Sequence, residues 1–143
     1  MDTANFFTGI EHLAIAARDP ERLAQWYVST LGFRVRTTLD GGPGKPQAYL
    51  LEAASGSWLE VFAADSVKGG GQRSNTEPGL AHLAILVSDF DAAQARLDQA
   101  GVSSAGPERA APLSSRVRFY RDPEGNLFHI LFRPWPVAEC TSP

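Results

Sequence analysis

The order of apolar and polar positions along the chain predicts the same series of elements twice. In the first half an apolar segment is followed by a helix that begins at Asp19-Pro20 and ends at Gly32, as is typical of helix caps. Strands are predicted there over 10–17, 33–39, 47–53 and 57–63. The second half predicts a helix capped within 88–91 and ending at Ala100, and strands over 80–87, 102–105, 116–121 and 127–132. Each half is therefore expected to form a β-α-β-β-β module.

The two halves are also alike residue by residue. Gly9-Ile10-Glu11-His12-Leu13-Ala14-Ile15 matches Gly79-Leu80-Ala81-His82-Leu83-Ala84-Ile85 at five positions, with a spacing of 70 residues. The last strands keep nearly the same spacing, because Glu60 and His129 are 69 residues apart. Self-similarity of this kind indicates an internal repeat.

Four ionisable residues fall at matching places in these apolar strands: His12, Glu60, His82 and His129. Because side chains alternate between faces along a strand, each of the four shares a face with apolar neighbours. A charged group on such a face is costly unless it has a partner. One divalent metal ion would satisfy all four groups, since imidazole and carboxylate bind zinc and first-row redox metals. The alternative is that each residue is structural and makes its own hydrogen bonds.

Composition and charge narrow the classes of function. The net charge is −3 and the basic residues are scattered, so a nucleic-acid partner is not expected. No apolar run approaches the roughly 18 residues of a membrane helix, and residues 1–8 lack a secretory signal, so a cytoplasmic protein is expected. The single cysteine, Cys140, cannot form an internal disulfide and suits a reducing compartment.

The expected organisation is a single domain over 9–133. It consists of module 9–64 and module 79–133, joined by linker 65–78, and a C-terminal tail follows over 134–143. Gly69-Gly70-Gly71 makes the linker either a flexible connection or a mobile cover over a pocket. The polar run 122–126 is interpreted as a turn between two strands.

Segments 9–15, 27–33, 79–84 and 119–126, together with Asp19-Pro20, resemble the vicinal oxygen chelate superfamily. This superfamily includes glyoxalase I, extradiol dioxygenases, fosfomycin-resistance enzymes and bleomycin-resistance proteins. The resemblance implies an α+β fold in which two βαβββ modules form open, curved mixed sheets that make a cup around a metal. It implies ligands on the first and fourth strands of each module, which here are His12, Glu60, His82 and His129. It also implies a homodimer.

His129 departs from the family pattern, because the family usually has glutamate at this position. In glyoxalase-like members that glutamate is also the catalytic base, so Glu60 becomes the candidate base here. Three imidazoles and one carboxylate leave a charge of about +1 with a divalent ion, which favours an anionic substrate such as an enolate, catecholate or carboxylate.

Three functions are consistent with this reading. The first is a metal-dependent glyoxalase-like enzyme of the lyase or isomerase type, which chelates two neighbouring oxygens of a small enolisable or anionic substrate with Zn, Ni, Fe or Mn and stabilises an enolate. The second is a non-haem iron ring-cleavage dioxygenase using two histidines and one carboxylate. The third is a non-catalytic binding protein like the bleomycin-resistance members. The candidate substrate-binding residues are Tyr49, Trp58, Phe62, Arg118 and Tyr120.

Overall fold

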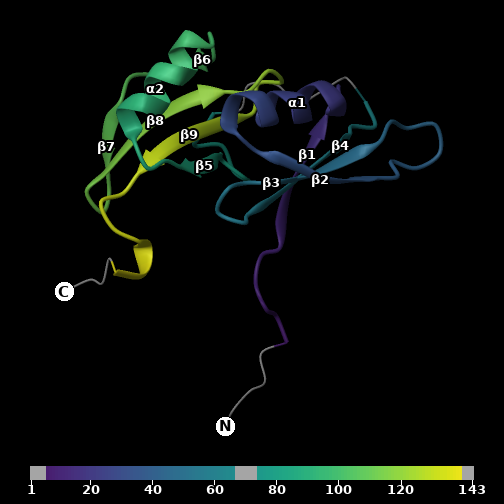
Figure 1. Ribbon diagram of the computed structural model, residues 1–143, viewed down its shortest axis with the longest axis horizontal. Coiled ribbons are helices and arrows are strands. Elements are labelled where there is room, and N and C mark those ends of the chain that lie inside the picture. The colour runs from purple at the N-terminus through teal and green to yellow at the C-terminus, as the bar shows by residue number, and fades with distance from the viewer. Residues whose placement is uncertain (1–5, 67–73, 140–143) are drawn as a thin grey trace. The chain divides into compact units, whose positions relative to one another are not determined.

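The computed structural model describes residues 6–66 and 74–139. The chain divides into two compact units, unit 1 (Met1–Lys68) and unit 2 (Gly69–Pro143). Figure 1 shows the elements of each unit in order along the chain. The predictions about Cys140 and about Gly69-Gly70-Gly71 concern positions outside the described residues.

The described residues of unit 1 form one helix and a sheet of four strands. Its elements are β1 (His12–Ala17), α1 (Pro20–Leu31), β2 (Arg34–Leu39), β3 (Ala48–Glu52) and β4 (Trp58–Ala63). The strand order is β1-β4-β3-β2, with β1 parallel to β4 and the other pairs antiparallel. The Asp19 carboxylate accepts a hydrogen bond of 3.0 Å from the backbone N–H of Arg22, and Gly32 ends the helix at a φ of 75°. Both ends of α1 are therefore where the sequence predicts them.

Unit 2 repeats this plan, and its described residues form one α-helix and a sheet of five strands. Its elements are β5 (Leu83–Leu86), α2 (Phe90–Gln99), β6 (Ser103–Ser104), β7 (Arg109–Ala111), β8 (Ser115–Arg121), β9 (Leu127–Phe132) and a short 3-10 turn (Val137–Glu139). The order is β5-β9-β8-β6, with β7 also paired to β8. Asp89 caps α2 by accepting a bond of 2.9 Å from the backbone N–H of Ala92. The mixed α+β fold and its repeated module are thus confirmed.

The strand register of the two units is equivalent at the candidate ligands. In unit 1 the first and last strands are parallel and Ala14 lies opposite Glu60. In unit 2 the corresponding pair is Ala84 opposite His129. His12 begins β1 and His82 directly precedes β5, so each stands two residues before that alanine. The repeat therefore places the four ionisable residues at matching backbone positions.

Several strands differ from the prediction at their ends. The strand expected over 10–17 begins at His12, and the strand expected over 80–87 is confined to Leu83–Leu86. A strand needs a partner, and the pairing of β5 with β9 begins at Leu83 opposite Phe128. The strand β7 was not predicted, because Arg-Ala-Ala shows no apolar alternation.

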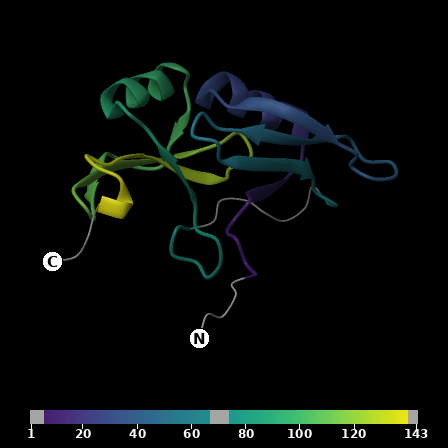
Figure 2. The same cartoon turned by 60° about the horizontal axis from the view of Figure 1, so that its bottom comes forward.

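Each sheet has one face packed against its helix and one face that carries the candidate ligands. In unit 1, Leu51, Leu59 and Val61 are buried beneath α1, so alternation puts Glu60 on the other face. In unit 2, Tyr120, Phe128 and Ile130 are buried on the α2 side, and His129 faces away from that helix. Figure 2 shows each helix lying along one side of its own sheet. Neither these helices nor any other in the described ranges is long and apolar enough to cross a membrane.

Candidate metal-binding site

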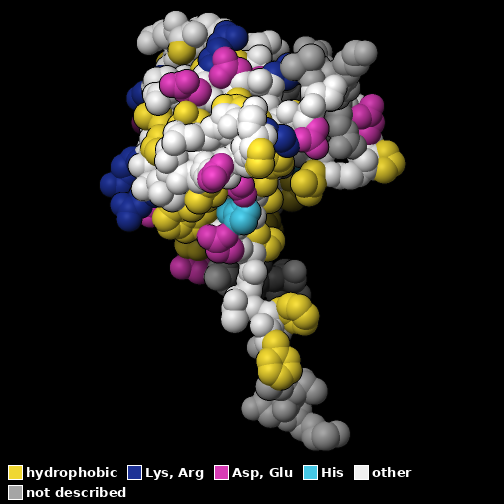
Figure 3. Space-filling model, turned by 90° about the vertical axis from the view of Figure 1, so that its right-hand side faces the viewer, with side chains coloured by type: hydrophobic (Ala, Val, Ile, Leu, Met, Phe, Trp, Pro, Cys, Tyr) yellow, Lys and Arg dark blue, Asp and Glu magenta, His cyan; other side chains and the backbone are white. Residues whose placement is uncertain are grey.

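The first pair consists of His12 and Glu60 in unit 1, on the adjacent parallel strands β1 and β4. The Nε2 atom of His12 lies 3.1 Å from Oε2 of Glu60, and its Nδ1 atom contacts the carboxylate of Glu11. The hydrogen bond to Glu11, followed by the negative charges of Glu11 and Glu60, raises the pKa of His12 against the opposing effect of burial. The His12 side chain is 37% exposed and that of Glu60 25%, and Figure 3 shows histidine at the surface bordered by acidic side chains. The first pair is therefore open to solvent and already satisfied by its own charges.

The second pair consists of His82 and His129 in unit 2, whose ring centroids are 4.4 Å apart. His129 lies in the middle of β9 and is only 9% exposed. Burial, followed by the positive charges of His82, Arg109 and Arg133, lowers its pKa to about 4. Burial also lowers the pKa of His82. Both imidazoles are therefore neutral near pH 7, which is the form that binds metals.

A hydrogen bond to Asn75 orients His82. Its Nδ1 atom lies 2.6 Å from Oδ1 of Asn75, an acceptor, so Nδ1 carries the proton. The lone pair of the ring is then on Nε2. Metal-bound histidines are commonly held in this way by a second group on the other ring nitrogen. Glu11 stands in the corresponding relation to Nδ1 of His12.

The ring of His129 has no such partner. Both of its nitrogens are buried and neither makes a hydrogen bond in the described part of the chain. An unsatisfied buried polar group lowers the stability of the fold by about 1–3 kcal/mol. A ligand bound to the His129 ring would remove this cost. Within residues 6–66 and 74–139 no three or more His, Cys, Asp or Glu side chains gather closely enough to hold a metal, and each unit brings together two of the four candidates. As a donor set, these imidazoles and the carboxylate fit a divalent ion.

Of the predicted substrate-binding residues of unit 1, the structure places Trp58 and Phe62 on the same face as Glu60. They flank it along β4, and Phe62 is 37% exposed. Tyr49 lies elsewhere, because it is opposite Val61 and so on the face packed against α1. Its pKa is raised by burial and then by the charges of Glu21 and Asp19 at the start of that helix. The prediction for Tyr49 is corrected accordingly.

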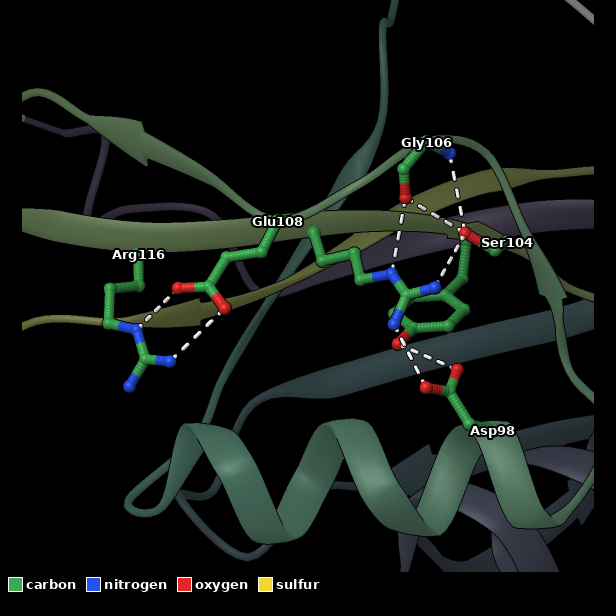
Figure 4. A network of polar contacts seen from close by, with 7 residues as sticks. Asp98, Ser104, Gly106, Glu108 and Arg116 are labelled. Carbon is green, nitrogen blue, oxygen red and sulfur yellow. Dashed lines mark hydrogen bonds and ion pairs between the residues drawn. The ribbon is translucent and has the colours of Figure 1, made fainter.

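Arg118 and Tyr120 also lie on a helix-covered face, away from His129. Arg118 Nη1 donates to Oδ2 of Asp98 on α2 at 2.9 Å, and the hydroxyl of Tyr120 donates to Oδ1 of the same carboxylate at 3.3 Å. Arg118 also donates to the carbonyl of Gly106 and to Ser104. Figure 4 shows Asp98 rising from the helix toward this network. These two residues fasten α2 and the sheet edge and are not placed to contact a substrate beside His129.

Three neighbours of the second pair were not predicted from the sequence. The ring of Phe119 lies 4.8 Å from the centroid of His129 and 5.2 Å from that of His82. The guanidinium of Arg109 lies 4.8 Å above the Phe119 ring. Arg133 is close enough to His129 to lower its pKa. Only the register of β8 against β9, with Phe119 opposite His129, reveals which residues share this face.

Solved structures similar to this chain include a glyoxalase family protein, an antibiotic-binding protein and a fosfomycin resistance protein. A glyoxalase family protein from Enterococcus faecalis is 29% identical, with a TM-score of 0.71 over 89% of this chain and 99% of that one. An antibiotic-binding protein from Streptomyces sp. CB03234 is 21% identical, with a TM-score of 0.69 over 90% and 98%. A mutant of the fosfomycin resistance protein FosX from Listeria monocytogenes, complexed with Mn(II) and 1S,2S-dihydroxypropylphosphonic acid, is 17% identical, with a TM-score of 0.64 over 87% and 89%. The two proteins below 25% identity show a shared fold.

Sequence comparison gives the family directly. Comparison with curated proteins found no match. A family model described as Glyoxalase/Bleomycin resistance protein/Dioxygenase superfamily matches residues 9–130. This match confirms the resemblance read from the repeated motifs. The chain belongs to the Glyoxalase/Bleomycin resistance protein/Dioxygenase superfamily.

Proposed function

We propose that this protein is a metal-dependent glyoxalase-like enzyme of the lyase or isomerase type. In this proposal His12, Glu60, His82 and His129 bind one divalent ion, and the substrate is a small molecule with two neighbouring oxygens. The observation that carries the proposal is the buried imidazole of His129, which lies beside His82 and whose two nitrogens make no hydrogen bond to any described residue. A buried donor without a partner is explained most simply by a ligand that the chain itself does not supply.

The second pair supplies neutral donors. His82 is oriented by Asn75, and the ring of His129 packs against the ring of Phe119. Rigid orientation lowers the cost of ordering the ligands when an ion binds. A divalent ion bound here supplies Lewis acidity, which stabilises negative charge developing on the substrate oxygens.

In the first pair, Glu60 has the role of the base. Its Oε2 atom is 3.1 Å from His12, and a quarter of its side chain is accessible, so it can approach a substrate. The carboxylate accepts a proton from the carbon next to a substrate carbonyl and returns it to a neighbouring atom. Trp58 and Phe62 provide apolar surface on either side of Glu60, which keeps water from competing for that proton.

Relatives of the same fold agree with a small-molecule ligand. The FosX mutant is described with Mn(II) and a phosphonic acid, and the Streptomyces protein as antibiotic-binding.

We further propose that two chains associate as a homodimer. Phe6, Phe7 and Ile10 are 87–88% exposed, and apolar side chains stand along this N-terminal segment in Figure 3. Exposed apolar clusters of this kind commonly mark association surfaces, and light scattering after gel filtration measures the mass of the assembly.

Metal analysis of the protein tests the proposal. We expect protein purified without chelator to hold about one divalent ion per chain, and the chelated protein to rebind Zn, Ni, Mn or Fe(II) at that ratio in calorimetric titration. If none of these ions binds, the metal-dependent function is wrong and a non-catalytic binding protein takes its place. If the Fe(II) form consumes oxygen with catechols, the reaction is that of a dioxygenase and not of a lyase or isomerase.

A further inference from the structure

Two arginines lie on the His129 face of the unit 2 sheet. Between them Val117, Phe119 and Leu131 are buried together, and Ala111 and Leu127 pack against this apolar cluster. Side chains opposite one another in antiparallel strands share a face, so the pairing of Arg109 with Val117 places Arg109 there. The cation–π contact of Arg109 with Phe119 confirms this position.

Arg133 reaches the same face from the end of β9. Its Nη1 atom donates to Oγ of Ser115 at 2.7 Å and to the carbonyl of Pro112 at 3.2 Å. These two bonds fix one side of the guanidinium and leave its other N–H groups available, since arginine has five donors. Arg109 and Arg133 both lie within electrostatic reach of the His129 ring.

No acidic side chain of the described residues neutralises the two arginines of this face. The neighbouring Arg116 is ion-paired to Glu108 and Asp91, and Arg118 is paired to Asp98. In the described part of the chain neither Arg109 nor Arg133 makes an ion pair, and both remain beside a buried neutral imidazole. Positive groups at the edge of an apolar surface attract an anion strongly, because the low dielectric strengthens the interaction.

We propose that Arg109 and Arg133 form a subsite for an oxyanion of the substrate, a carboxylate or a phosphonate, on the His129 face of unit 2. This inference deepens the proposed function and rests on it for the identity of the reaction centre. The planar guanidinium of Arg109, held on Phe119, presents paired N–H groups that match two oxygens of such an anion. The substrate is then a small acid whose charged group is bound apart from the oxygens that meet the metal.

The test uses methylphosphonate and acetate as probes, with acetamide as the neutral counterpart of acetate. Each is titrated into the full-length protein and followed by amide NMR, once after chelation and once with one equivalent of zinc. We expect saturable shifts at residues 109–133 with at least one anion and none with acetamide. Arg109→Gln should weaken that binding by about ten-fold or more, since hydrogen bonds to charged groups are among the stronger ones.

Arg96→Gln is the matched control, because it removes one positive charge from unit 2 on the helix α2 at the opposite face. It should change anion affinity less than two-fold, in line with the weak effect of distant exposed charges. Equal losses in the two variants, or equal binding of acetamide, would overturn the subsite. Anion binding that depends on Arg109 in a protein that binds no metal would support the subsite and refute the proposed metal function. Metal binding without anion binding that depends on Arg109 would support the proposed metal function and refute the subsite.

Discussion

The first pair and the second pair stand at equivalent positions of one repeat and have opposite surroundings. His12 is exposed and both of its ring nitrogens face carboxylates. His129 is buried, and neither of its ring nitrogens has a hydrogen-bond partner among residues 6–66 and 74–139. The two modules therefore share the same backbone geometry, while the neighbouring side chains determine the protonation state of each histidine. In the metal-free protein the described residues provide partners for the first pair but not for His129. Ion binding is therefore expected to stabilise the second pair more than the first.

The largest effect on zinc affinity is expected from replacing the buried imidazole of His129. His129→Leu should lower zinc affinity by more than about 100-fold, because loss of a direct ligand exceeds the 10–100-fold cost of losing an outer partner. Calorimetric titration measures it. Glu60→Gln is the counterpart in the first pair and should weaken binding less, since an amide oxygen still occupies the position. Unchanged zinc affinity in His129→Leu would remove His129 from the ligand set.

The pH dependence of stability separates the two pairs in the metal-free protein. Folding holds the pKa of His129 near 4 instead of 6.5, so the unfolded chain takes up this proton first as pH falls. The free energy of unfolding should therefore decrease between pH 6.5 and 4, by up to about 3 kcal/mol. His12, whose pKa is raised, contributes in the opposite sense, with stability that is present at low pH and lost as pH rises.

Urea denaturation at pH 7 and pH 4.5 with chelator present measures this difference. His129→Leu should remove most of the loss at low pH, whereas His12→Gln should leave that loss in place or enlarge it. A pH dependence that survives in His129→Leu would show that other groups cause it.

Asn75 and Glu11, the side chains that contact Nδ1 of His82 and His12, should contribute unequally to zinc affinity. Asn75→Ala should reduce zinc affinity by about ten-fold, because the His82 ring loses the acceptor that fixes its proton on Nδ1. Glu11→Gln should have a smaller effect, since the Glu11 side chain is 70% exposed and water can take its place. Zinc titration of both variants at one pH compares them directly, and the reverse order would mean that the first pair is the more tightly organised.

The smallest effect is a gain in stability. At pH 7 without metal, His129→Leu should raise the free energy of unfolding by about 1 kcal/mol, because it replaces a buried unsatisfied ring with an apolar side chain. Chemical denaturation measures the change. A decrease instead would indicate that the ring is held by packing that leucine cannot reproduce.

Much of the fold was predictable because its signals are local. Asp19 and Asp89 cap their helices through backbone atoms three residues away, and Asp122 organises the turn before β9 through the backbone N–H groups of Glu124 and Asn126. Such contacts depend on neighbouring residues alone. The matching positions of the four candidate ligands also follow from the repeat, since the same register recurs in both units.

The environment of the candidate site was less predictable because it depends on which strand face each helix covers. Tyr49, Arg118 and Tyr120 suit a binding site by residue type, yet a shift of one position along a strand reverses the face. The antiparallel register that pairs Phe119 with His129 excludes Arg118 and Tyr120 from that face. Arg109 was missed for a related reason, because its short strand is identified only by pairing with β8.

The edge of the unit 2 sheet is divided between β6 and β7, whereas the corresponding edge of unit 1 is the single strand β2. Residues 106–108 connect the two short strands and are fastened to β8 through Gly106 and Glu108. Insertions or deletions in this connection would move Arg109 along the sheet edge while His129 stays fixed on β9. The fold thus separates an edge connection that carries one arginine of the proposed anion subsite from the central strand that carries His129.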